Sequence, residues 1–235
     1  MPNSEIEFVS GQEILRGTLS LPQKGMQPTV LAMHGAGQSH SGTLAYLCDR
    51  LGERGLGAFR FDFSGHGQSS GTIGNSSLAK RLDEARSAAR HIALDKYPIL
   101  VGSSMGAHIA SRLANELGAK ALILFSPAAF AADAEELGFS HGFTEIIRRP
   151  FSYENSLVFS ALDAFRGSCL FVTGSEDKVI PRRVLDLYHA RCSSAKLKVW
   201  IEVRGAHHRL HDWFQTQPTM RELVLGQIMS FACTV

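Results

Sequence analysis

The sequence predicts an α/β protein with a mostly parallel sheet and helices on both faces of that sheet. Apolar runs of strand length recur from residue 30 onward, and most stretches between them repeat apolar residues at helical spacing. Strands that are apolar almost throughout are typical of a parallel sheet that is covered on both sides. In such sheets the ligand site lies beyond the carboxyl ends of the strands, and most reactive side chains of this chain follow a predicted strand directly.

The elements begin with an antiparallel hairpin, because residues 5–10 and 13–21 alternate with a period of two around Gly11-Gln12. Apolar strands are then predicted at residues 30–33, 57–61, 99–101, 121–125, 170–172 and 197–203. Amphipathic helices are predicted at residues 43–54, 78–94 and 106–117.

One segment, residues 131–166, interrupts this alternation and is too long for a plain connection. It is rich in aromatic residues, namely Phe139, Phe143, Phe151, Tyr153, Phe159 and Phe165, and shows weak helical patterning near residues 134–137 and 155–165. Two interpretations are compatible with each other. The segment is a short lid over the strand ends, or it is an extra pair of helices that packs its aromatic rings into the core.

Composition narrows the class of protein. The 235 residues, of which 44% are hydrophobic and 20% charged, suit a single globular domain spanning residues 1–235. The 24 basic and 22 acidic residues are interspersed, so we expect no nucleic-acid partner. No segment approaches the roughly 20 apolar residues that span a bilayer, which argues against a membrane protein.

The cysteines and the N-terminus favour a cytoplasmic protein. Four cysteines, at positions 48, 169, 192 and 233, are scattered singly, which is typical of reduced thiols and not of a disulfide framework or a zinc site. The first residues, MPNSEIEFVSGQ, lack the basic start and apolar stretch of a signal peptide.

The stretch GSSMG, residues 102–106, has the G-x-S-x-G pattern of a nucleophile on a sharp turn between a strand and a helix. Ser104 is the middle residue of the pattern, so Ser104 and not Ser103 is the candidate nucleophile. The glycines leave room for the turn, and the start of the following helix places positive potential where negative charge develops during attack.

A serine needs a base, and the base needs a carboxylate to orient it. His207 and His208 follow the last predicted strand in a glycine-started loop, and His211 is a weaker third candidate on the next helix. Glu176 and Asp177 lie in a turn after an earlier strand, where an acid can also cap the next helix. The order serine, acid, histidine is that of the α/β-hydrolases.

Two further loops follow strands. The loop His34-Gly35-Ala36-Gly37 is built of small residues whose backbone N–H groups can supply an oxyanion donor, with His34 holding the loop. Asp62 and His66, in the glycine-shaped loop DFSGHGQSSG, are also interpreted as loop-holding groups and not as catalytic ones.

Taken together, the chain resembles the α/β-hydrolase superfamily over nearly its whole length. Within it the chain is most similar to small bacterial serine esterases and acyl hydrolases, including cinnamoyl and feruloyl esterase-like members. The motifs that carry the resemblance are, in chain order, HGAG at 34–37, DFSGHGQSSG at 62–71, GSSMG at 102–106, GSEDKVIP at 174–181 and GAHH at 205–208.

The resemblance implies an α/β-hydrolase fold with a sheet of about eight strands, a Ser–Asp–His triad and no cofactor or metal. Matched motif to motif, it places the acid at Asp177, the base at His208 and the oxyanion donors at the backbone N–H groups of Ala36 and Met105. Ala36 stands where the family has a bulkier residue, which implies a wider acyl pocket. The insertion is shorter than the lids of cinnamoyl esterases, so their phenol-binding residues are not carried over.

We therefore expect a serine hydrolase that cleaves small-molecule carboxylic esters through an acyl-enzyme, with no membrane partner. The phenylalanines of the insertion favour an apolar or aryl acyl group. Thioesters and peptides are alternative substrates, because the same triad serves all acyl transfers. The alternative from another class is a non-catalytic binding protein with a hydrolase fold. Neither the natural substrate nor the oligomeric state follows from the sequence.

Overall fold

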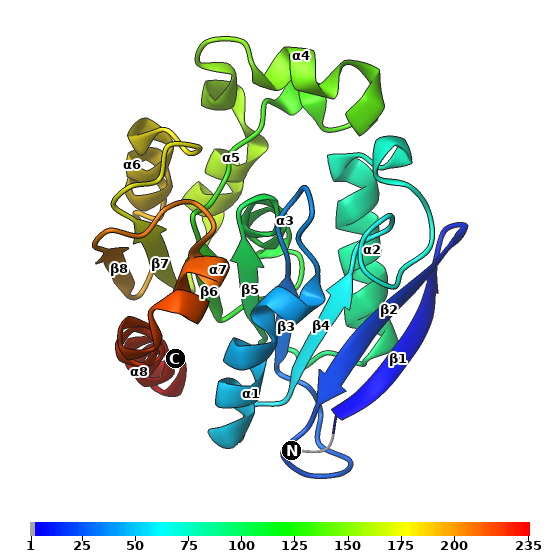
Figure 1. Ribbon diagram of the computed structural model, residues 1–235, viewed down its shortest axis with the longest axis vertical. Helices are drawn as coiled ribbons and strands as arrows, with labels where there is room; N and C mark the ends of the chain where they lie inside the picture. Colours follow the sequence, from blue (N-terminus) through cyan, green and yellow to red (C-terminus); the bar gives the residue numbers. More distant parts are fainter. Residues whose placement is uncertain (1–2) are drawn as a thin grey trace.

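The computed structural model describes residues 3–235 and contains one sheet of eight strands in the order β1-β2-β4-β3-β5-β6-β7-β8 (Figure 1). Its first strands, β1 (Asn3–Ser10) and β2 (Glu13–Ser20), form the predicted antiparallel hairpin, and β2 pairs antiparallel with β4. The turn of this hairpin begins at Gly11, whose φ of 59° favours glycine.

All remaining neighbours in the sheet are parallel, which confirms the predicted class. These strands are β3 (Val30–Met33), β4 (Ala58–Asp62), β5 (Ile99–Ser103), β6 (Ala121–Phe125), β7 (Ser168–Gly174) and β8 (Lys198–Val203). Because they are parallel, their carboxyl ends lie at one edge of the sheet, where the loops that carry the candidate residues begin.

Helices cover both faces of the sheet and enclose two apolar cores. On one face lie α2 (Leu78–His91), α3 (Met105–Leu113), α5 (Leu157–Ala164) and α6 (Arg182–Arg191), and on the other lie α1 (Ala45–Glu53), α7 (Leu210–Thr216) and α8 (Pro218–Thr234). Strand β3 shows the alternation behind this arrangement. Leu31 and Met33 belong to the first core, and Val30 and Ala32 belong to the second.

Helix α3 ends earlier than the predicted helix at 106–117. The chain leaves the α-helix after Leu113 and continues in turns to Gly118, whose φ is 63°. This left-handed residue ends the helical path, and β6 begins three residues later at Ala121.

The insertion at residues 131–166 begins beyond the carboxyl ends of the strands, at the top of the molecule, and ends in α5, which packs on the first core (Figure 1). It consists of short helical segments: Ala132–Ala134, Phe139–Phe143, α4 (Thr144–Ile147), Ser152–Asn155 and α5. Some of its aromatic rings, such as Phe159, are buried in the core, whereas Phe151 is exposed. The core-packing interpretation therefore applies to part of the segment.

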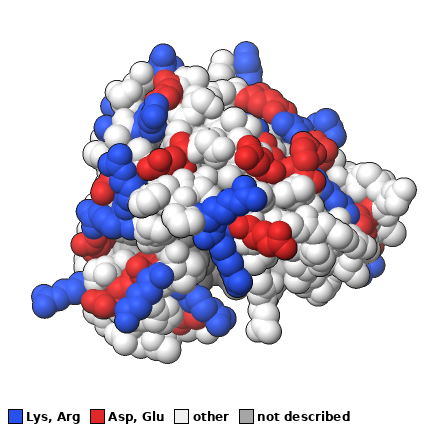
Figure 2. Space-filling model, turned by 90° about the horizontal axis from the view of Figure 1, so that it is seen from above, with Lys and Arg blue, Asp and Glu red and all other residues white. Residues whose placement is uncertain are grey.

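Viewed from above, lysines and arginines are mixed with acidic residues and separated by uncharged surface (Figure 2). This distribution agrees with the interspersed charges of the sequence. Among the helices of residues 3–235, none combines the length and apolar composition that crossing a membrane requires.

Candidate active site

Ser104 lies at the sharp turn between β5 and α3, with φ of 52° and ψ of −111°. A non-glycine residue adopts such angles only where the surroundings impose them, and this strain is typical of a nucleophile turn. The flanking glycines make the turn possible. A Cβ on Gly106 would collide with the backbone carbonyls of Met33 and His34, and one on Gly102 would collide with the first turn of α3.

Backbone hydrogen bonds hold Ser104 from both sides. Its N–H donates to the carbonyl of Phe125 at 2.8 Å, and its own carbonyl accepts from Ala128 N–H at 3.2 Å. Ala128 is in turn held by Tyr188 of α6, whose hydroxyl donates to the Ala128 carbonyl at 2.7 Å. Sequence reasoning missed these supports, because backbone contacts between distant segments leave no motif.

The structure brings Ser104, His208 and Asp177 together from three different loops. His208 Nε2 is 3.1 Å from Ser104 Oγ, and His208 Nδ1 is 2.9 Å from Asp177 Oδ2. An ionised carboxylate only accepts, so Nδ1 carries the proton and Nε2 presents its lone pair to the serine hydroxyl. This is the arrangement in which a serine can be deprotonated during attack.

The Asp177 carboxylate is held rigidly. Its Oδ1 accepts from the N–H groups of Val179 at 2.8 Å and Ile180 at 3.0 Å, and its side chain is 2% exposed. Burial by itself would raise the pKa of Asp177, but the hydrogen bonds from His208 and from the two N–H groups lower it overall. The carboxylate therefore stays ionised beside the imidazole.

The competing candidates of the sequence lie elsewhere. Glu176 and His207 are both exposed, and neither side chain hydrogen-bonds to another described residue. His211 is buried, and its Nδ1 is 3.0 Å from the Tyr46 hydroxyl. Adjacent residues of a tight turn point in different directions, and the sequence does not show which of the two faces the serine. Spacing alone therefore could not choose between Glu176 and Asp177 or between His207 and His208.

The loop after β3 approaches Ser104 closely. A Cβ built on Gly35 would lie 3.3 Å from the Ser103 carbonyl and 3.5 Å from Ser104 Cβ. Neither Ala36 N–H nor Met105 N–H donates to an acceptor among residues 3–235. Two free N–H groups beside the serine suit an oxyanion, and that role of Ala36 and Met105 stays a prediction.

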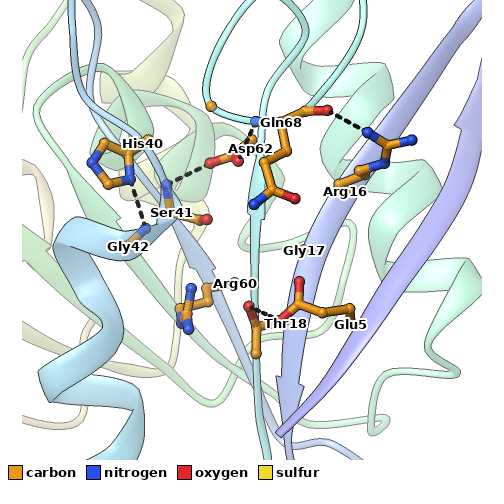
Figure 3. Close-up of a pocket in the computed structure, with 11 residues that line it drawn as sticks. Glu5, Arg16, Gly17, Thr18, His40, Ser41, Gly42, Arg60, Asp62 and Gln68 are labelled. Carbon is orange, nitrogen blue, oxygen red and sulfur yellow. Dashed lines mark hydrogen bonds between the residues drawn. The ribbon is translucent and has the colours of Figure 1, made fainter.

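His34 and Asp62 have the surroundings of loop-holding groups. Buried His34 donates from Nδ1 to the Gly35 carbonyl at 2.7 Å and accepts from Phe63 N–H at 3.1 Å, and burial lowers its pKa to about 3. Asp62 accepts from Ser41 N–H at 2.6 Å and from Gln68 N–H at 3.0 Å (Figure 3). The Asp62 carboxylate borders a cavity of about 350 Å³, and no member of the Ser104–His208–Asp177 group lines it.

Comparison with known proteins places the chain in a family. Residues 25–149 match the hydrolase family described as serine aminopeptidase, S33. The match covers more than half of the chain, so the protein belongs to this family of α/β-hydrolases. The match contains Ser104, Ala36 and Met105, whereas Asp177 and His208 lie beyond it.

Solved structures share the fold at low sequence identity. Est1E of Butyrivibrio proteoclasticus, with ferulic acid bound, is 20% identical with a TM-score of 0.71, over 95% of this chain and 99% of that one. A predicted CIB-like hydrolase of Thermoplasma acidophilum is 14% identical with a TM-score of 0.71, over all of both chains. The thioesterase domain of the curacin biosynthetic pathway is 16% identical with a TM-score of 0.71, again over all of both chains.

Proposed function

We propose that this hydrolase is a serine carboxylesterase that works through an acyl-enzyme. The observation that carries the proposal is the hydrogen-bonded series Ser104 Oγ, His208 Nε2, His208 Nδ1 and Asp177 Oδ2, with contacts of 3.1 and 2.9 Å. This series starts at a half-buried serine whose backbone is strained in the sharp turn between β5 and α3.

The chemistry proceeds in two halves. The Ser104 oxygen attacks the ester carbonyl while its proton passes to His208 Nε2, and Asp177 stabilises the imidazolium. The oxyanion accepts hydrogen bonds from the N–H groups of Ala36 and Met105. The imidazolium then protonates the departing alkoxide, which leaves an acyl-serine. In the second half, water loses a proton to His208 and attacks the acyl carbonyl. The bond to Ser104 Oγ then breaks, the imidazolium returns its proton to that oxygen, and the carboxylic acid is released.

An apolar or aryl acyl group is the substrate class that we favour. The support is a row of aromatic rings that begins at Phe130, two residues beyond the Ala128 support of Ser104. The ring centre of Phe130 lies 5.5 Å from that of Phe143, and the ring centre of Phe143 lies 4.7 Å from that of Phe139. Phe143 and Phe139 belong to the insertion. In this proposal the insertion acts as a short lid over the bound acyl chain.

A second candidate is thioester hydrolysis, because the same three residues serve it and one structure of this fold is a thioesterase domain. Matched aryl and alkyl esters and thioesters of graded chain length, assayed with the parent and with Ser104→Ala, separate the two. We expect kcat/KM of the parent to be highest for aryl esters. Higher kcat/KM for every thioester than for its matched ester would assign the thioesterase function instead.

A further inference from the structure

The turn that carries the Ala36 N–H is held at its far end by a histidine outside the Ser104–His208–Asp177 group. Ser39 N–H donates to the Ala36 carbonyl at 3.4 Å, which closes a turn over residues 36–39. His66 Nδ1 lies 2.9 Å from the Ser39 carbonyl. The carbonyl can only accept, so this contact exists only if Nδ1 bears the proton.

Arg81 of α2 determines which nitrogen of His66 bears that proton. Its Nη2 lies 2.8 Å from His66 Nε2. A guanidinium has donors and no acceptor, so Nε2 must present a lone pair and the proton of neutral His66 must be on Nδ1. Burial and the nearby Arg81 charge both lower the pKa of His66, which keeps the ring neutral.

The environment of Arg81 keeps its guanidinium in one place. The residue is 1% exposed, and its guanidinium carbon lies 4.7 Å from the ring centre of Phe63 and 5.1 Å from that of Phe139. Arg81 Nε and Nη1 have no hydrogen-bond partner among residues 3–235, so its buried charge is compensated by the aromatic faces and by the nearby Glu84 carboxylate. Phe139 belongs to the insertion, which therefore contacts the same group.

We propose that Arg81 and His66 are positioning residues for the oxyanion hole: Arg81 fixes the tautomer of His66, and His66 holds the 36–39 turn so that the Ala36 N–H faces the reacting carbonyl. The inference rests on the proposed esterase function. It predicts that the pair acts on kcat through oxyanion stabilisation and leaves the base, His208, unchanged.

Two substitutions of His66 test the hydrogen bonds themselves. Glutamine can accept from Arg81 through Oε1 and donate to the Ser39 carbonyl through Nε2, whereas leucine can do neither. Full removal of an oxyanion donor costs roughly 10²–10³ in kcat, and we expect a smaller loss of roughly 10- to 100-fold for His66→Leu, since the donor is displaced and not deleted. For His66→Leu we expect KM to stay within about threefold of the parental value and the acidic limb of the pH profile to keep its position. For His66→Gln we expect kcat to stay near the parental value.

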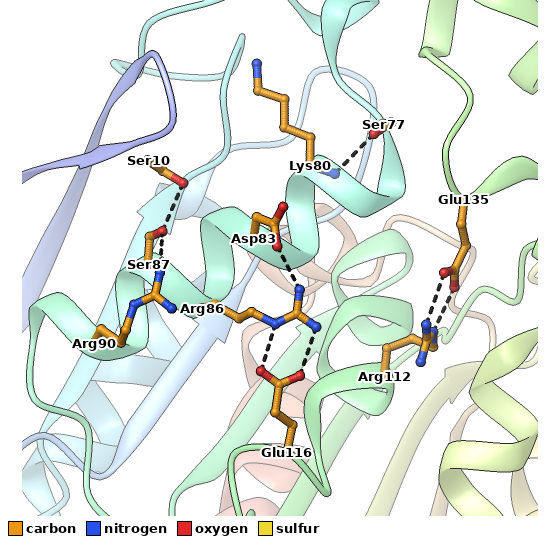
Figure 4. Close-up of polar contacts among 10 residues, drawn as sticks. All are labelled: Ser10, Ser77, Lys80, Asp83, Arg86, Ser87, Arg90, Arg112, Glu116 and Glu135. Atoms are coloured by element: carbon orange, nitrogen blue, oxygen red, sulfur yellow. Dashed lines mark hydrogen bonds and ion pairs between the residues drawn. The ribbon is translucent and has the colours of Figure 1, made fainter.

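The inhibition constant of a trifluoromethyl ketone provides the readout specific to the oxyanion. Its hemiketal with Ser104 places a negative oxygen in the oxyanion hole, so this constant should rise for His66→Leu in proportion to the loss of kcat/KM. Arg86→Gln is the matched control, because Arg86 lies on the same helix but bonds Asp83 and Glu116 at the surface (Figure 4). That variant should keep the parental kcat.

The tautomer of His66 can be measured in the parent protein, so this test does not depend on whether a variant folds. Nitrogen-15 NMR of the histidine rings at neutral pH should find His66 protonated on Nδ1 and unprotonated on Nε2. An Nε2-protonated His66 would overturn the inference, as would parental kcat in His66→Leu, or equal damage from His66→Gln and His66→Leu at equal Tm. A parent that neither turns over esters nor labels at serine would refute the esterase function instead, and the NMR result still tests the His66 tautomer.

Discussion

At the scale of single residues, two adjacent carboxylates have very different surroundings. Asp177 receives three hydrogen bonds, one from His208 and two from backbone N–H groups, whereas adjacent Glu176 is exposed. The sequence could place an acid in this turn but could not choose between the two residues by spacing. Only the resemblance to a known motif selected Asp177, and the structure shows that its carboxylate faces the imidazole.

Asp177→Asn tests the acid. The amide nitrogen would turn a donor toward His208 and favour the wrong tautomer, so we expect kcat to fall by on the order of 10⁴ with an unchanged Tm. Glu176→Gln is the control and should keep the parental kcat. Equal loss in both variants, measured by steady-state kinetics beside thermal unfolding, would mean that the acid lies elsewhere.

Adjacent histidines give a second test at this scale. His208→Ala removes the group 3.1 Å from Ser104 Oγ, so turnover should be lost together with the acidic limb of the kcat/KM profile. His207→Ala changes an exposed side chain and should leave the limb where it was. If the limb survived in purified His208→Ala and vanished in His207→Ala, the two roles would have to be exchanged.

At the scale of elements, the turn that carries Ser104 packs closely against the end of β3, and this packing fixes the position of Ser104. Gly106→Ala would drive a methyl group into the carbonyls of Met33 and His34, and overpacking of this kind costs about 1–3 kcal/mol. We expect a lower Tm and a loss of ester turnover. Gly226→Ala in α8 is the matched control, because nothing lies within 4 Å of its added Cβ, and it should raise the Tm slightly. A parental Tm and turnover in Gly106→Ala would show that the packing is loose.

The start of the insertion is attached to α3 by an ion pair that titrates. Glu135 accepts from Arg112 at 2.7 and 3.0 Å (Figure 4), and His108 Nε2 lies 3.7 Å from Glu135 Oε1. Burial alone would raise the pKa of Glu135, but these two residues lower it from 4.5 to about 2. A carboxyl whose pKa is lower in the folded state stabilises above its unfolded pKa, and this contribution is lost as pH falls through the folded value.

Glu135→Gln should therefore lower the Tm at pH 7, and the gap from the parent should narrow as pH falls from 4.5 toward 2. Glu116→Gln, which breaks the surface pair with Arg86, should change the Tm less, because exposed ion pairs contribute little. Thermal unfolding followed by circular dichroism over this pH range measures both. A gap that stayed constant with pH would show that the Glu135 charge contributes no stability.

At the scale of the whole molecule, the periodicity of the sequence was sufficient to predict the fold class, because most strands are apolar runs and the helices predicted at residues 43–54, 78–94 and 106–117 each have one apolar face. The hairpin, the six parallel strands and the position of Ser104 followed from these patterns. The supports of the site did not. The contacts between Tyr188 and Ala128 and between Arg81 and His66 join a helix to a loop that precedes it in the chain, and neither contact has a signature in the sequence.

Labelling with a fluorophosphonate, followed by intact mass and peptide mapping, tests the central claim most directly. The probe reacts only with a serine whose hydroxyl is activated by a neighbouring base. We predict one adduct on Ser104 in the parent and in Ser103→Ala. We predict no adduct in Ser104→Ala or in His208→Ala, although both variants should keep the parental Tm. Labelling of Ser104→Ala at the parental rate, or no labelling of the folded parent, would contradict the assignment of Ser104 as an activated nucleophile.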